Sequence, residues 1–137
     1  MRVEPRIRAA LAGAVLLLVV GGAGGAPALE DSGAPCTTVA ERPRTIRIDG
    51  RPAVAARHAV VCEAPVAEIV VRGSLSRDGD EVARVIRTCA WASSCVATSS
   101  ARNPGGVQVW RGRTAGSYRA GGATRSLLPA TSPSMKA

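Results

Sequence analysis

The chain lacks most of the residues from which catalytic and nucleic-acid sites are built. Its 137 residues contain no phenylalanine, two tryptophans and one tyrosine, too few for the stacking platforms that bind single-stranded nucleic acids. It has one histidine, His58, and no C-x-x-C pair, which argues against a cysteine and histidine zinc site and a redox dithiol. No serine lies in a G-x-S-x-G motif, and three of the few acids crowd one turn, at 78–81. We therefore expect no catalytic site, no metal or cofactor and no specific nucleic-acid role.

The N-terminus has the pattern of a secretory signal peptide. Three arginines among the first eight residues precede an uninterrupted apolar run over 11–20, and Ala26-Pro27-Ala28 provides a small-residue cleavage signal. The run is short for a membrane span, and no second apolar run follows it. We expect residues 1–28 to be a signal peptide cleaved after Ala28, and the mature chain to be secreted, extracellular or cell-wall associated, without a transmembrane segment. An uncleaved anchor is the alternative.

Four cysteines remain in the mature chain: Cys36, Cys62, Cys89 and Cys95. In a small exported protein, cysteines are typical of a disulfide framework. Four cysteines allow three pairings, and the stretch Cys89–Cys95, CAWASSC, raises the alternatives of a redox or metal site. We expect Cys36 to pair with Cys62, because both lie near predicted strands, and Cys89 with Cys95, because their short loop can close on itself.

Two Asp-Gly dipeptides predict tight β-hairpins. The second, Asp78-Gly79, joins two alternating segments over 67–77 and 80–89. A two-residue turn there sets Leu75 opposite Val82 and Val71 opposite Ile86, with Arg84 opposite Gly73, which leaves space for the arginine stem.

The first dipeptide, at 49–50, joins TIRI to RPAVAARHAVVC, where His58 shares a face with the apolar positions Val54, Ala56, Val60 and Cys62. Another break, at 103–106, precedes VQVWRGR. No part of the mature chain has an apolar period of 3.6 residues. The pattern predicts an all-β fold, a small antiparallel immunoglobulin-like β-sandwich stapled by disulfides, over residues 29–120. Residues 121–137, rich in Gly, Ser, Thr and Pro, are expected to form a basic, disordered tail.

Charge is distributed unevenly along the mature chain. Residues 29–100 contain nine basic and nine acidic side chains, whereas residues 101–137 contain six basic and no acidic ones, which gives 15 minus 9, or +6, over 29–137. The six are Arg102, Arg111, Arg113, Arg119, Arg125 and Lys136. A one-sided basic region predicts an anionic partner, for which we favour an anionic cell-envelope polymer. Arginine bias in codon usage is the alternative explanation.

Several elements resemble a group of small uncharacterised secreted proteins of actinobacteria. They are Cys62, the stretch Gly73–Gly79, the pair Cys89 and Cys95, and Asn103-Pro104-Gly105 with Trp110. The span Cys89–Val109 is also similar to neocarzinostatin-type chromoproteins, which are secreted sandwiches with two disulfides that carry an apolar ligand. The first resemblance implies no function, and the second implies a carrier.

The sequence therefore predicts a non-catalytic extracellular or cell-surface binding module. One alternative is a carrier of a small apolar ligand in a cleft lined partly by Trp91 and Trp110. The other is a secreted inhibitor that uses the loop Cys89–Cys95, because a closed loop is pre-organised for binding.

Overall fold

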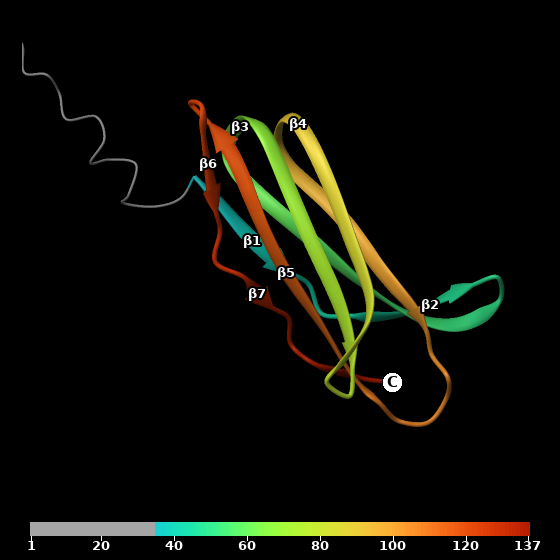
Figure 1. Cartoon of the computed structure of the whole chain (residues 1–137). Coiled ribbons are helices and arrows are strands. Elements are labelled where there is room, and N and C mark those ends of the chain that lie inside the picture. The colour runs from blue at the N-terminus through green and yellow to red at the C-terminus, as the bar shows by residue number, and fades with distance from the viewer. Residues whose placement is uncertain (1–34) are drawn as a thin grey trace, which may run out of the picture.

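The computed structural model describes residues 35–137, and all of its regular structure is β-strand (Figure 1). The predicted signal peptide and its cleavage site lie outside the described residues. Within residues 35–137, no helix is long and apolar enough to cross a membrane. The strands are β1 (Cys36–Ala40), β2 (Arg44–Ile48), β3 (Arg51–Arg77), β4 (Asp80–Arg102), β5 (Val109–Ala120), β6 (Ala123–Ser126), β7 (Ala130–Thr131) and β8 (Met135–Lys136).

Two long, bent strands, β3 and β4, build both layers of the fold (Figure 1). Their antiparallel ladder is interrupted between Val61 and Val66, where Pro65 has no N–H to donate. The first half of β3 pairs with β1, β2 and the second half of β4, which together form the first layer. The second half of β3 pairs with the first half of β4 and with β5, and β6, β7 and β8 continue this second layer beyond β5. The predicted all-β antiparallel sandwich is confirmed.

The core between the layers consists of two apolar clusters separated by polar residues. The larger cluster joins Val60 and Cys95 of the first layer to Ile69 and Tyr118 of the second. The smaller one, near the other end of the strands, contains Val54, Ala56, Leu75 and Trp110. His58, Ser99 and Thr114 are buried at strand positions between the two clusters, so the core-facing placement of His58 is confirmed.

Both Asp-Gly turns form as predicted, with positive φ at both residues of each turn. The predicted register beyond the second turn is wrong by one residue. Ser76 pairs with Glu81, but a bulge at the next step sets Leu75 opposite Ala83 and Gly73 opposite Val85. The physical reason is that the imidazole of His58, and not an arginine stem, fills the space above Gly73. Arg84 is exposed and bonds Glu81 instead.

The C-terminal segment is not the disordered tail that its composition predicted. It runs antiparallel along β5, held by backbone N–H groups that donate from Leu127 to Gly116 O (2.9 Å), from Ser132 to Gly112 O (2.8 Å) and from Ala137 to Gln108 O (3.0 Å). The buried Ser132 hydroxyl also accepts a hydrogen bond from Gly112 N. Without this segment β5 would present unpaired backbone groups at a sheet edge, so pairing stabilises a sequence whose composition alone indicates disorder.

Candidate functional site

The stretch CAWASSC is a staple. Cys89 and Cys95 form a disulfide, which we call the corner disulfide, and Cys36 and Cys62 form the β1–β3 disulfide, so the expected pairings are confirmed. Cys89 lies opposite Ile69 in the second layer and Cys95 opposite Val60 in the first. The corner disulfide therefore holds β4 across the bend that separates the two layers.

Trp91, inside the corner loop, is held in an unusual position. Its backbone has φ of 49°, a left-handed value that side-chain-bearing residues rarely adopt, and its side chain is 80% exposed. Trp110 is fully buried in the smaller cluster, next to the guanidinium of Arg77. The two tryptophans lie at different ends of the second layer, so the predicted cleft lined by both is not formed.

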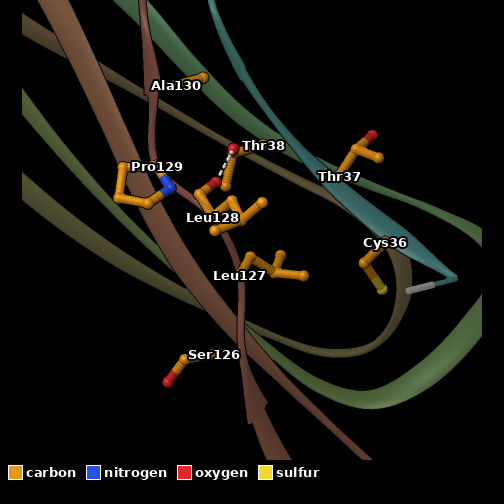
Figure 2. Close-up of a pocket in the computed structure, with 8 residues that line it drawn as sticks. All are labelled: Cys36, Thr37, Thr38, Ser126, Leu127, Leu128, Pro129 and Ala130. Atoms are coloured by element: carbon orange, nitrogen blue, oxygen red, sulfur yellow. Dashed lines mark hydrogen bonds between the residues drawn. The ribbon is translucent and has the colours of Figure 1, made fainter. Parts of the chain in front are cut away.

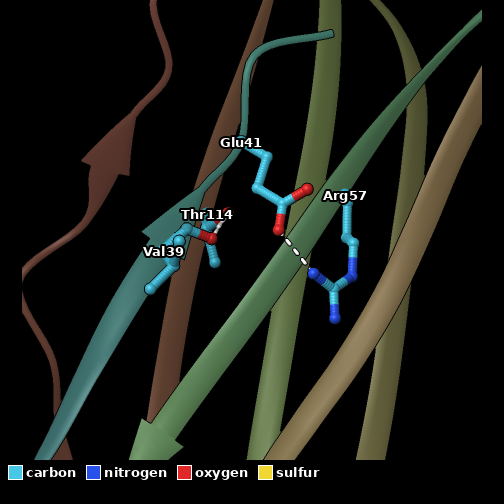
Figure 3. A network of polar contacts seen from close by, with 4 residues as sticks. All are labelled: Val39, Glu41, Arg57 and Thr114. Carbon is cyan, nitrogen blue, oxygen red and sulfur yellow. Dashed lines mark hydrogen bonds and ion pairs between the residues drawn. The ribbon is translucent and has the colours of Figure 1, made fainter. Parts of the chain in front are cut away.

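His58 is the centre of a buried polar cluster. Thr114 Oγ1 donates its proton to Val39 O (2.9 Å; Figure 3), so the hydroxyl accepts from His58 Nδ1 (3.0 Å). Nε2 then carries no proton and accepts from the hydroxyl of Ser99 (2.7 Å). A neutral imidazole satisfies both partners, and burial lowers the pKa of His58.

The distance between Ser99 and His58 is that of a nucleophile and its general base, but the pair is not accessible to a substrate. His58, Ser99 and Thr114 are all buried, so no substrate can reach the serine. Sequence reasoning missed Ser99 and Thr114. Strand phase could have identified them: Thr114 lies on the same strand face as the buried positions 112 and 116, and Ser99 on the same face as 95 and 97. The cluster fixes the packing of the layers and is not an active site.

The outer face of the second layer is strongly basic. We call the surface formed by Arg72, Arg111, Arg113 and Arg119 the basic face. Register places these side chains on the outer side of β3 and β5, and all four are exposed. Among residues 35–137 these four form no ion pair, although Glu68 lies opposite Arg119.

Other arginines of the chain are engaged by the fold. Arg57 pairs with Glu41 (Figure 3) and Arg84 with Glu81, while Arg87 donates to the backbone oxygen of Val96. The fold therefore divides the predicted basic region: three of its six cations, Arg111, Arg113 and Arg119, lie on the basic face. Arg72, which sequence order did not single out, joins them because β3 runs beside β5.

A shallow pocket of about 260 Å³ lies on the basic face, and we call it the basic-face pocket. Polar side chains from four strands line it, together with two glycines: Ser74, Ser76, Gly79, Glu81, Arg111, Gly112, Arg113 and Thr131. Arginine and hydroxyl groups in one depression are suited to binding an oxyanion.

A larger pocket of about 440 Å³ separates β1 from the C-terminal segment, and we call it the β1 pocket. Figure 2 shows Leu127, Leu128 and Pro129 on one side and Cys36 on the other, with the Thr38 hydroxyl donating to Leu128 O (2.6 Å) across the gap. Leu128 is 88% exposed. The wall of this pocket is built from the segment that was expected to be a tail, so the sequence could not reveal it.

No group of three or more residues that could hold a metal occurs within residues 35–137.

No family model matches the chain, and no curated protein matches it. A crystal structure of a protein from Archaeoglobus fulgidus aligns with 73% of this chain and 93% of its own, at 14% identity and a TM-score of 0.40.

Proposed function

We propose that this protein is a non-catalytic, extracellular binding module that attaches to an anionic polymer of the cell envelope through the basic face. The observation that carries the proposal is the set of four exposed arginines, Arg72, Arg111, Arg113 and Arg119, that share one sheet face and form no ion pair among the described residues. Like charges on one face repel one another and attract a polyanion, which relieves the repulsion.

An extracellular location is supported by two features. The chain forms two disulfides, and disulfides are typical of proteins that mature in an oxidising compartment. The N-terminal sequence has the charged, apolar and small-residue regions of a secretory signal. Outside the cell, a basic module is in contact with the anionic polymers of the envelope.

The test is binding to labelled poly(glycerol phosphate) at increasing salt. Replacing Arg111 and Arg113 by Gln should weaken binding by about tenfold and flatten its salt dependence, because two charge-assisted contacts are lost. The matched control replaces Arg44 and Arg51 by Gln on the projecting β2–β3 hairpin (Figure 1), where both arginines are also exposed. Equal losses in the two variants would show attraction by net charge alone and would refute a specific basic face.

The β1 pocket supports a second candidate function, a carrier of a small apolar molecule. Its volume of about 440 Å³ falls within the usual range of ligand pockets, and Leu127, Leu128 and Pro129 give it an apolar wall. Native mass spectrometry of protein secreted by its own host should then show extra mass that is lost on denaturation. A Leu128→Ser variant should lose that mass, and an empty wild-type chain would rule the carrier out.

A further inference from the structure

The basic-face pocket owes its shape to two arginine–serine pairs. Arg113 lies directly across from Ser74, and Arg111 directly across from Ser76, on neighbouring strands of the outer face. Side chains opposite each other in an antiparallel pair lie close together on the same face. Two short hydroxyl side chains beside two long guanidinium side chains leave a depression, which both kinds of side chain line.

The donors of this pocket are available. The hydroxyls of Ser74 and Thr131 and the guanidinium groups of Arg111 and Arg113 have no hydrogen-bond partner within residues 35–137. The Ser76 hydroxyl already donates to Arg111 O (3.2 Å), so it offers lone pairs rather than a proton. One side of the pocket therefore presents charged donors suited to an oxyanion.

The opposite rim presents an acceptor. Glu81 lines the same pocket, and Arg84 bonds only its Oε1. Its Oε2 forms no hydrogen bond with any described residue, so it can accept a hydrogen bond from a ligand hydroxyl. The same carboxylate repels a second negative charge at that rim.

From this arrangement we infer that the basic-face pocket binds one polyol-phosphate or sugar-phosphate unit, with its phosphate on Arg111 and Arg113 and a hydroxyl on Glu81. The volume of about 260 Å³ exceeds that of a lone phosphate and leaves space for the attached hydroxyl-bearing carbons. The inference rests on the proposed function and narrows its polymer to one in which phosphates alternate with hydroxyl-bearing units. A polymer charged at every position, such as polyphosphate, would set a second anion against Glu81.

The experiment is an NMR titration of the isotope-labelled full mature chain with glycerol 3-phosphate, inorganic phosphate and glycerol at constant ionic strength. We expect amide shifts centred on Ser74, Ser76 and Gly112, saturating with glycerol 3-phosphate at a concentration about fivefold or more below that for phosphate, and no shifts with glycerol alone. Two variants locate the chemistry. Arg111→Gln with Arg113→Gln should abolish the shifts, whereas Glu81→Gln should strengthen phosphate binding and remove the preference for glycerol 3-phosphate. Arg44→Gln with Arg51→Gln is the control and should behave as wild type.

The outcomes separate this inference from the function on which it rests. If poly(glycerol phosphate) binds through the basic face but glycerol 3-phosphate shifts no pocket amide, the pocket is not the recognition site, and only the broader function stands. Equal affinities for phosphate and glycerol 3-phosphate, unchanged by Glu81→Gln, would overturn the assigned hydroxyl contact. Specific binding of glycerol 3-phosphate without any polymer binding would support the pocket and refute the polymer function. Thermal melts of each variant confirm that it is folded.

Discussion

Replacing Gly73 by alanine tests how closely the two layers pack at the polar cluster. An added Cβ would lie 2.2 Å from Cδ2 and 2.3 Å from Cγ of His58, well inside van der Waals contact. The ring would have to move and lose its bonds to Ser99 and Thr114, which contribute about 1 kcal/mol each, and overpacking adds about 1 to 3 kcal/mol. We expect Gly73→Ala to lower the free energy of unfolding by about 3 to 5 kcal/mol.

The assay is urea unfolding of the oxidised protein, run as a double-mutant cycle with His58→Ala. Removing the imidazole opens the space that the new methyl needs, so Gly73→Ala should cost less than about 1 kcal/mol in that background. Gly116→Ala is the control, because its Cβ would meet Val60 Cγ2 at 2.6 Å, a clash that His58→Ala does not relieve. Additive losses for Gly73→Ala and His58→Ala would refute the packing account.

Three further predictions concern pH, the disulfides and the tryptophans. Burial lowers the pKa of His58 from its ordinary value of 6.5, so below pH 6.5 the unfolded chain binds a proton at this residue more readily than the folded protein does. The free energy of unfolding should therefore decrease as the pH is lowered below 6.5, and more steeply than in His58→Gln. Equal slopes in the two proteins would contradict this prediction. Removing the β1–β3 disulfide, with a sequence separation of 26, should cost about 3.5 kcal/mol, against about 2.2 kcal/mol for the corner disulfide, with a separation of 6. Denaturant midpoints check this order, and the reverse order would count against the chain-entropy estimate. Acrylamide should quench the exposed Trp91 strongly in Trp110→Phe, and the buried Trp110 weakly in Trp91→Phe; similar quenching would contradict their placement.

The sequence alone determined the features that depend on neighbours along the chain. Asp49-Gly50 and Asp78-Gly79 form turns because these residues tolerate positive φ. Strand phase along β3 predicted that His58 lies on the same face as Val54 and Val60, which belong to the core clusters. The disulfide pairing also followed from local reasoning, since one pair closes a short loop.

The tertiary structure decided what depends on contacts between distant segments. The register after Asp78-Gly79 shifted because His58, from the other layer, occupies the space above Gly73. The segment 121–137 forms strands because it pairs with the edge of β5, and amino-acid composition holds no information about that pairing. The basic face has the same origin: Arg72 shares a sheet face with Arg113, its diagonal neighbour, only because β3 and β5 pair, and charge counted along the sequence does not contain that neighbour relation.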